Sequence, residues 1–446
     1  MLDNIMLMTD GYKASHWRQY PPKTEVVYSY LESRGGEFDN TVFFGLQYIM
    51  QRYLAGQVVD DYKIANAASF MARYLGPGVF NEAGWRHIHI AHNGRLPLVI
   101  RALKEGTPVD VHTPLMTVEN TCPECYWLTN YVETLLVQVW YPTTVATLSR
   151  ECKRLILSYL VNNGDETTIP WKLHDFGYRG VSSVESAALG GAAHLVNFRG
   201  TDTIAGIELA MTYYMGGNRT GNVGPTIADS IPASEHSTIT AWGKDGELDA
   251  FRNMLEQYPT GLVACVSDSY DLRTALTSYW GGSLKGMVLN REGTLIVRPD
   301  SGRPVESVLV CLERLDEAFG SSVNVKGFRV LNPHVRIIQG DGVDAESIDE
   351  ILSEMEDSGW SADNVAFGMG GALLQKVNRD TQKFAMKCSW VQVDGQGRAV
   401  FKAPIGDPGK RSKAGRFDSE KLHIVFRYGE MMGHQSFEDV RKRAAL

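Results

Sequence analysis

A short run of mainly β-branched residues recurs four times between residues 262 and 371, and this repeat constrains the fold more than any other feature. The runs end about 30 to 40 residues apart, the span of one strand–helix unit. An amphipathic helix pattern follows each of the first three, and Asp344 with Ser347 predicts one such helix start. We therefore predict an α/β fold in which residues 146–384 form a (βα) barrel. The four runs are Leu262–Val266, Leu295–Val297, Val335–Ile338 and Asn364–Phe367.

Acidic and glycine residues gather in the loops that leave these runs. In parallel α/β folds, ligands bind beyond the carboxyl ends of the strands, so we expect the active site in these loops. Asp268, Asp300 and Asp341 follow successive strands. Carboxylates there suit ribose hydroxyls, Mg²⁺ or a positive charge developing on a sugar ring, although each Asp is equally suited to capping a helix.

Two further loops carry groups suited to phosphate. Arg298 stands two residues before Asp300, where it can clamp a phosphate or an amide, or form a structural salt bridge. Gly370 and Gly371 open the last strand–helix turn, a place where backbone N–H groups often hold phosphate, and a structural turn is the alternative. Arg379 and Lys387 follow downstream, either as phosphate ligands or as solvated surface cations.

An aromatic residue beside a cation suggests a grip on a flat ring. Phe176 and Arg179 lie in His174-Asp-Phe-Gly-Tyr-Arg, which contains a kinase-like Asp-Phe-Gly without the other kinase signatures. The alternative is a core aromatic with a surface arginine. His236 follows Glu235 and precedes a helical stretch, and a structural histidine is the alternative there.

Composition excludes several classes of protein. The chain has 446 residues with 44 basic and 52 acidic side chains, a net charge of −8, so it lacks the basic footprint of a nucleic-acid-binding protein. The most apolar stretch, residues 131–148, contains Glu133 and Pro142, which predicts a buried helix and no membrane span. The beginning of the chain does not read as a signal peptide, and six cysteines are too few for a disulfide framework. We expect a cytoplasmic protein.

Two patterns look like fragments of metal sites. Cys122-Pro-Glu-Cys125 is a single CxxC without a second ligand pair. His87, His89 and His92 have no acid or cysteine at ligand spacing. Neither pattern predicts a metal, a partly exposed structural cluster is favoured for the histidines, and we predict no metal-binding residues.

Long motifs throughout the chain resemble the nicotinamide phosphoribosyltransferase family. The resemblance runs from about residue 5 to the C-terminus in the family's order. The motifs that carry it are Thr9–Lys13, Leu173–Ser183, Asn197–Thr203, Glu235–Trp242, Ser267–Asp271, Arg298–Gly302, Ile338–Asp344 and Lys410–Lys413.

The resemblance implies a type II phosphoribosyltransferase. Its fold would be an α/β barrel over 146–384, flanked by an α+β sandwich from residues 1–145 and 385–446. The family forms nicotinamide mononucleotide and pyrophosphate from nicotinamide and phosphoribosyl pyrophosphate. Mg²⁺ would accompany the phosphate groups, ATP hydrolysis would be coupled through a phosphohistidine, and two copies would form a dimer with active sites at the interface.

Residue roles follow from the same resemblance. The catalytic residues would be His236, as the phosphorylated histidine, with Asp300 and Asp341. Phe176 and Tyr12 from a second copy would stack on nicotinamide, while Asp202 would accept from its carboxamide. The substrate-binding residues would be Asp10, Tyr12, Phe176, Arg179, Asp202, Asp268, Arg298, Gly340, Gly370, Gly371, Arg379, Lys387, Lys402 and Lys410.

Three alternatives stay open at this point. The first is a nicotinate phosphoribosyltransferase, which Asp202 would disfavour because a carboxylate repels nicotinate. The second is a non-catalytic ligand-binding protein on the same scaffold, although every acid, Arg and His position in the motifs is occupied. The third is a phosphosugar isomerase or aldolase, which would need a buried Lys or a Glu base at a strand end. No such residue stands out in the sequence.

Overall fold

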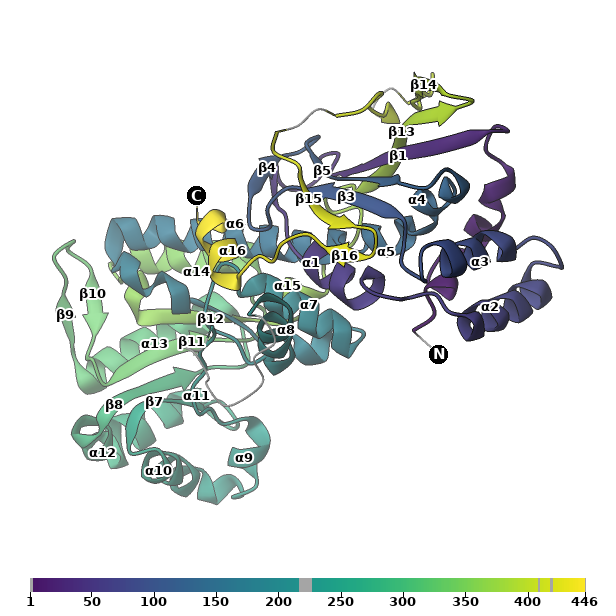
Figure 1. Ribbon diagram of the computed structural model, residues 1–446. Coiled ribbons are helices and arrows are strands. Elements are labelled where there is room, and N and C mark those ends of the chain that lie inside the picture. Colours follow the sequence, from purple (N-terminus) through teal and green to yellow (C-terminus); the bar gives the residue numbers. More distant parts are fainter. Residues whose placement is uncertain (1–2, 216–226, 408–409, 418–419, 446) are drawn as a thin grey trace. The chain divides into compact units, whose positions relative to one another are not determined.

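A computed structural model describes residues 3–215, 227–407, 410–417 and 420–445 (Figure 1). The chain divides into two compact units. Unit 1 comprises Met1–Thr147, Ala210–Arg219 and Asn378–Leu446, and unit 2 comprises Leu148–Leu209 and Thr220–Val377. Unit 2 contains the four recurring runs, and unit 1 contains both ends of the chain.

Five parallel strands form the sheet of unit 2. The first in sequence is β6, and each of the other four coincides with one of the predicted runs. Their order is β6 (Leu173–Asp175), β12 (Val365–Met369), β11 (Val335–Gln339), β8 (Glu292–Arg298) and β7 (Thr260–Val266). A small hairpin of β9 (Ser321–Val323) and β10 (Arg329–Leu331) precedes β11.

Single parallel bridges connect the two edges of this sheet. Asp175 at the end of β6 pairs with Thr201, Gly200 pairs with Asp229, and Ala233 pairs with Ala264 of β7. The main-chain pairing therefore runs around a closed ring, as the barrel prediction requires. Three of its joints are single bridges, whereas β7 and β8 pair through seven residue pairs.

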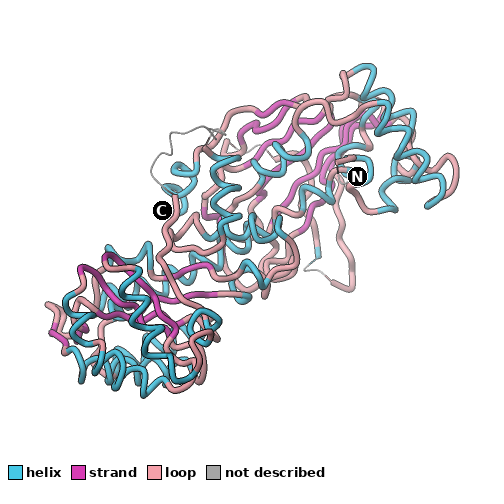
Figure 2. The backbone as a smooth tube through the Cα atoms, turned by 90° about the horizontal axis from the view of Figure 1, so that it is seen from below, coloured by secondary structure: helices cyan, strands magenta, loops and turns pink. Residues whose placement is uncertain are grey.

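Helices cover the outside of this ring (Figure 2). Asp344 and Ser347 form a capping box at the start of α14, as the sequence predicts, because each side chain satisfies the other residue's main-chain N–H. The predicted apolar stripe of α13 is buried at Val308, Leu312 and Leu315. The helices of this part of the chain are α6 (Trp140–Asn163), α7 (Val184–His194), α8 (Ile204–Tyr214), α9 (His236–Thr240), α10 (Glu247–Gln257), α11 (Leu272–Thr274), α12 (Lys285–Asn290), α13 (Pro304–Phe319), α14 (Ala345–Asp357) and α15 (Gly371–Leu374).

A seven-stranded antiparallel sheet forms the centre of unit 1, with strands from both chain ends side by side. The contact that joins the ends is the long pairing of β1 with β13. This arrangement confirms the predicted α/β fold with a flanking domain built from both termini. The strand order is β14 (Gln396–Ala399), β13 (Ala385–Val393), β1 (Thr24–Glu32), β5 (Pro114–Asn120), β3 (Leu98–Ala102), β15 (His423–Arg427) and β16 (Glu430–Met431).

Shorter elements complete unit 1. Within residues 124–160, two short helices precede α6, and Pro142 lies in the first turn of α6, a position where its missing N–H costs nothing. None of the helices in the described ranges is both long and apolar enough to cross a membrane. The remaining elements are β2 (Asn40–Val42), β4 (Pro108–Asp110), α1 (Leu46–Ile49), α2 (Asp61–Tyr74), α3 (Glu82–Ala91), α4 (Leu128–Tyr131), α5 (Glu133–Val137) and α16 (Phe437–Ala444).

Candidate active site

A cavity of about 430 Å³ runs along the inside of the barrel. Lys172 and Pro333, which precede β6 and β11, line one end, whereas Phe176 and Arg298, at the far ends of β6 and β8, line the other. The middle is walled mainly by small and aliphatic side chains, among them Ala264, Ile296, Ile338 and Ala366. Alanine in two of these positions leaves open space where larger side chains would fill a barrel.

A second cavity, of about 630 Å³, opens at the carboxyl ends of the strands. Phe176, Asp202 and Arg298 line both cavities, so they stand where the two meet. Arg179 lines the outer cavity from the turn after β6. The structure thus brings together four of the residues that the sequence predicted to bind substrate.

Two glycines make room for the Phe176 ring. A Cβ added at Gly368 would lie 2.0 Å from Cε2 of Phe176, and one added at Gly340 would lie 3.3 Å from the same atom. The main-chain N–H of Phe176 donates to the carbonyl of Met369 at 3.0 Å, which fixes the residue at the end of β6. Gly340 and Gly368 therefore serve the aromatic wall of the cavity.

Arg298 and Asp300 form a two-pronged ion pair at the end of β8. Nε of Arg298 lies 3.1 Å from Oδ1 of Asp300, and Nη2 lies 2.7 Å from Oδ2. The guanidinium carbon also lies 6.0 Å from the centre of the Phe176 ring. This geometry holds a cation beside the aromatic wall with its orientation fixed by the carboxylate.

His236, Asp268 and Asp300 converge from three different loops. Nε2 of His236 lies 3.3 Å from Oδ2 of Asp300 and 4.0 Å from Oδ1 of Asp268, while Nδ1 lies 3.0 Å from the Ser269 hydroxyl. The imidazole is 45% exposed and the Asp268 carboxylate only 3% exposed. The half-exposed imidazole of His236 therefore lies against two carboxylates, of which that of Asp268 is buried.

The Asp268 carboxylate is held by hydrogen bonds to one oxygen, whereas its other oxygen accepts none. Its Oδ2 accepts from the Asp300 main-chain N–H at 2.8 Å and from the Ser301 hydroxyl at 2.5 Å. Its Oδ1 is buried and has no hydrogen-bond partner. Because an orphaned carboxylate oxygen is costly to bury, this atom marks a place where a cation or a donor group would be stabilised.

Asp202 faces the cavities from the first of the single-bridge joints. Its Oδ1 accepts from the Ser230 hydroxyl at 2.5 Å, and its main-chain N–H donates to the Asp175 carbonyl at 2.9 Å. Asp175 itself is buried beneath the site, where burial raises the pKa of its carboxyl to about 6. The Asp202 carboxylate is exposed and can accept from a ligand.

Other predicted residues of unit 2 stand apart from the His236 cluster. Asp341 is exposed on the loop after β11, and no hydrogen bond or ion pair joins its carboxylate to His236, Asp268 or Asp300. Gly370 caps α15 and Gly371 begins it, with open space around the Gly371 Cα.

Several predicted substrate residues belong to unit 1. Tyr12 is 63% exposed, and the Asp10 carboxylate accepts from the Thr134 hydroxyl at 2.7 Å. Lys410 pairs with Asp407 at 2.8 Å on an exposed loop.

A cluster of cations in unit 1 surrounds Lys387. Burial lowers the pKa of Lys387, and although Glu133 opposes the shift, the charges of Arg34, Lys402 and Arg379 lower this pKa further. Two other predicted substrate-binding residues, Lys402 and Arg379, therefore lie close enough to Lys387 to repel its charge. The sequence analysis missed Arg34, and the only signal that could have revealed it is its place in Ser33-Arg-Gly-Gly, a basic residue before two glycines.

The amino end of the barrel also carries buried cations, one of which bears on the aldolase alternative. Lys172 is buried just before β6, and burial lowers its pKa to about 8. In the sequence no buried lysine stands out at a strand end, and Lys172 does not supply one beside the loops of the site, because it precedes β6 at the amino end of the barrel. The Lys172 amine donates to the Ala362 and Val365 carbonyls, so it is engaged in holding the main chain.

Comparison with known proteins places these features in one family. The model for the nicotinate phosphoribosyltransferase (NAPRTase) family matches residues 171–430, more than half of the chain. The chain belongs to this family. A second model, for the nicotinamide phosphoribosyltransferase N-terminal domain, matches residues 4–100. The family assignment makes the protein an enzyme of the pentosyltransferase class.

Relatives within the family cover nearly the whole chain. A nicotinamide phosphoribosyltransferase of Xanthomonas campestris pv. campestris is 53% identical over 419 residues, which are 93% of this chain and 87% of the relative. One of Acinetobacter baylyi is 34% identical over 503 residues, or 99% of this chain and 97% of the relative.

Solved structures share the fold at low identity. Nicotinate-nucleotide pyrophosphorylase from Pyrococcus furiosus superimposes with a TM-score of 0.59 at 15% identity, covering 99% of this chain and 95% of that one. Human nicotinic acid phosphoribosyltransferase gives a TM-score of 0.57 at 16% identity, covering 98% and 93%. Both support the type II phosphoribosyltransferase architecture.

Proposed function

We propose that this enzyme joins nicotinamide to phosphoribosyl pyrophosphate, forming nicotinamide mononucleotide and releasing pyrophosphate. The observation that carries the proposal is the junction of the two barrel cavities, where Phe176, Asp202 and Arg298 present an aromatic face, an acceptor and a cation together. The names of the relatives from Xanthomonas campestris and Acinetobacter baylyi support the same reaction.

Nicotinamide binds against Phe176 in this proposal. The ring stacks on the aromatic side chain, and the carboxamide N–H₂ donates to Asp202, whose carboxylate is exposed to the cavities. Arg179 lies on the wall of the outer cavity, where it reaches the amide or a phosphate. Tyr12 of the partner subunit supplies the second stacking face, so the proposal includes a homodimer, and sedimentation of the purified protein tests this part.

The reaction exchanges one bond at the ribose for another. The pyridine nitrogen forms a bond to C1′ as the bond from C1′ to the pyrophosphate oxygen breaks, and positive charge develops on the ring in between. The carboxylate of Asp300 stabilises that charge, with Arg298 holding the carboxylate in place. Asp341, Gly340, Gly370 and Gly371 take the remaining ribose and 5′-phosphate contacts in this proposal.

The pyrophosphate leaves with help from cations. The hard oxygen donors of Asp268 and Asp300 fit Mg²⁺, and the buried Oδ1 of Asp268, which has no hydrogen-bond partner, is the atom that most favours a cation there. A bound Mg²⁺ would neutralise charge on the leaving group. We assign phosphate binding also to the cations of unit 1, namely Arg379, Lys387, Lys402 and Lys410.

ATP is coupled through His236 in the same proposal. Transfer of the terminal phosphoryl group from ATP to an imidazole nitrogen would release ADP, and hydrolysis of the phosphohistidine would return the free histidine. The hydrogen bond between Nδ1 and Ser269 and the approach of Nε2 to Asp300 orient the ring for such a step. We expect His236→Ala to abolish stimulation by ATP while a slower basal reaction continues, and full stimulation in this variant would refute the coupling.

A paired assay tests the main proposal. Purified protein receives phosphoribosyl pyrophosphate and Mg²⁺ with either nicotinamide or nicotinic acid, and chromatography quantifies the mononucleotide. We expect product mainly from nicotinamide. Absence of product from both would contradict the proposed reaction.

Nicotinic acid is the second candidate substrate, because the matching family model bears the name of the nicotinate enzymes. Asp202 discriminates against it by charge, so Asp202→Ala should raise the turnover of acid relative to amide by about tenfold or more. Ser230→Ala, which removes the hydroxyl donor but keeps the carboxylate, is the matched control. An unchanged ratio in Asp202→Ala would show that another group selects the amide.

A further inference from the structure

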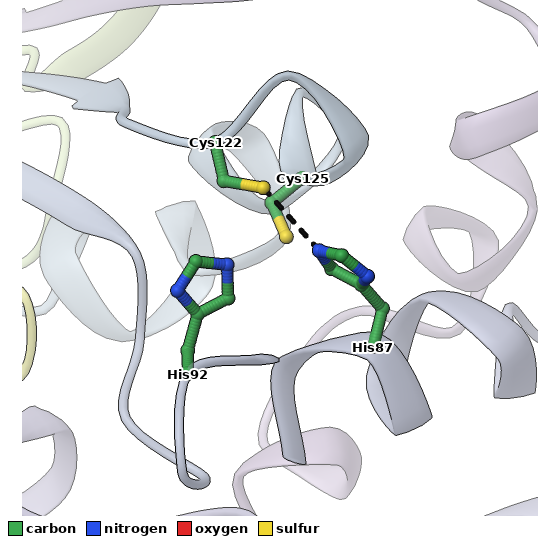
Figure 3. Close-up of side chains that lie close together, drawn as sticks. All are labelled: His87, His92, Cys122 and Cys125. Carbon is green, nitrogen blue, oxygen red and sulfur yellow. Dashed lines mark hydrogen bonds between the residues drawn. The ribbon is translucent and has the colours of Figure 1, made fainter. Parts of the chain in front are cut away.

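Two histidines and two cysteines of unit 1 converge at a place remote in sequence from every residue assigned above. His87 lies on α3 and His92 caps its C-terminal end, whereas Cys122 and Cys125 flank the short turn after β5. One potential ligand atom from each of the four residues lies within 4.8 Å of the others. Figure 3 shows the two imidazoles facing the two thiols from opposite sides.

The surrounding structure holds the two segments in register. The ring of Trp85, on α3, packs edge-to-face against Trp127 at 4.9 Å and against Tyr131 at 5.2 Å. The Asn120 side chain donates to the Cys122 carbonyl at 2.8 Å and so anchors the cysteine turn to the end of β5. The four donors are therefore presented by a packed framework.

The spacing of the donors fits a tetrahedral metal. With Zn–S of about 2.3 Å and Zn–N of about 2.0 Å, neighbouring donors of a tetrahedron lie about 3.3–3.8 Å apart. Nε2 of His87 and Sγ of Cys122 are 3.4 Å apart and already form one such edge. Because all the other pairs lie within 4.8 Å, side-chain rotations of about an ångström complete the tetrahedron.

Burial without satisfied hydrogen bonds points to a missing partner. Nε2 of His92 is buried and has no hydrogen-bond partner, although an imidazole nitrogen in that position normally finds one. Cys125 is fully buried and Cys122 nearly so, and both are free thiols. The Cys122 thiol donates to the exposed Glu124 carboxylate at 3.0 Å.

We propose that His87, His92, Cys122 and Cys125 bind one Zn²⁺ as a structural site. Two thiolates with two imidazoles in a tetrahedron favour zinc over other common divalent ions. On binding, the two thiols release two protons to solvent, and the loaded site, with one dication, two thiolates and two neutral imidazoles, carries no net charge. Four protein ligands leave no open position, so the ion fastens α3 to the turn after β5 and takes no part in catalysis.

Metal analysis of the full-length protein tests the site directly. We expect about one zinc per chain after purification from zinc-supplemented cells without an affinity tag of histidines. Replacement by Co²⁺ should give the intense visible absorption of a tetrahedral cobalt site, with a charge-transfer band from thiolate to metal. Chelation of the zinc should lower the Tm by about 5 °C or more.

Matched variants identify the ligands. Cys122→Ser and Cys125→Ser should lose the zinc and the cobalt spectrum, whereas Cys388→Ser in β13 and His89→Asn on α3 should keep both. The cobalt spectrum of the parent protein does not depend on how well any variant folds. Less than about one-tenth of a zinc per chain, with no cobalt spectrum from reduced protein, would overturn the proposal. A metal-free protein with Cys122 and Cys125 joined in a disulfide would overturn it equally.

Discussion

The two ends of the barrel use the same kinds of side chain for different purposes. At the amino end, Nη1 of Arg336 donates to the carbonyls of Leu331, Asn332 and Val335. At the carboxyl end, Arg298 pairs with Asp300 beside the Phe176 ring. The first arginine is engaged by the main chain, while the second stands at the wall of two cavities. Since Arg336 also lines the inner cavity, we expect the partners of a cation, more than its place in a cavity wall, to distinguish a structural role from a role in binding.

Replacing each arginine separately tests whether the two have different roles. We expect Arg298→Gln to lower kcat/KM about 1,000-fold, or about 4 kcal/mol, because it loses the oriented positive charge at the cavity wall. Arg336→Gln should instead lower the free energy of unfolding by roughly 2–3 kcal/mol, since buried carbonyls lose their donor. Steady-state kinetics and urea denaturation of both variants provide the check. A large kinetic loss in Arg336→Gln without a loss of stability would contradict the distinction.

Adding a single methyl group at Gly368 tests whether the position of the Phe176 ring matters for activity. In Gly368→Ala the new Cβ would lie 2.0 Å from Phe176, so the ring must move. We expect kcat/KM for nicotinamide to fall about 100-fold. Gly286→Ala, which meets open space on α12, is the control and should leave the kinetics unchanged. Parental kinetics in Gly368→Ala would show that the position of Phe176 does not matter.

The buried carboxyl of Asp175 should make the stability of the carboxyl end depend on pH. Burial raises the pKa of Asp175 from 3.8 to about 6, so the folded chain binds this proton more tightly than the unfolded chain. The stability that this group contributes is present at low pH and is lost as the pH rises through about 6. Asp175→Asn should therefore stabilise the protein by roughly 2–3 kcal/mol at about pH 8 and by much less at about pH 4.5.

Urea denaturation at both pH values measures this difference. The exposed Asp357→Asn, at the end of α14, serves as the control and should show no gain that depends on pH. An equal gain from Asp175→Asn at the two pH values would mean that the buried charge is not the cause.

The smallest effect concerns the support beneath His236. Ser301→Ala removes one of the two donors to Oδ2 of Asp268 and keeps the other, the main-chain N–H of Asp300. We expect a loss of about 1 kcal/mol in stability and a change in turnover of no more than about fivefold. A much larger kinetic loss would indicate that Ser301 contacts the substrate and does not only support Asp268.

The sequence predicted the barrel strands that are rich in β-branched residues and missed the parts of the ring that are not. Strands β7, β8, β11 and β12 lie where the runs were read. Strand β6 has three residues, and the joints at Thr201 and Asp229 are single bridges, too short for any periodicity to register. Tertiary closure, not local propensity, creates these segments.

The same contrast applies to side-chain clusters. Asp268, Asp300 and Asp341 follow successive parallel strands that end at one edge, and the first two meet there, whereas no hydrogen bond or ion pair joins the Asp341 carboxylate to them. No such rule relates α3 to the turn after β5, so the histidines and the CxxC pair were read as separate fragments. Tertiary packing, including the contact of Trp85 with Trp127, brings them together.

The closure of the ring through single bridges has a consequence for how ligands affect this enzyme. Asp202 lies directly beside the joint between Asp175 and Thr201, whereas Phe176 extends from β6 on the other side of it. A molecule that contacts both residues spans one of the three single-bridge joints of the ring. Binding would then stabilise this joint against local opening. The stabilisation would be observed as slower amide exchange and greater resistance to proteases along that side of the barrel.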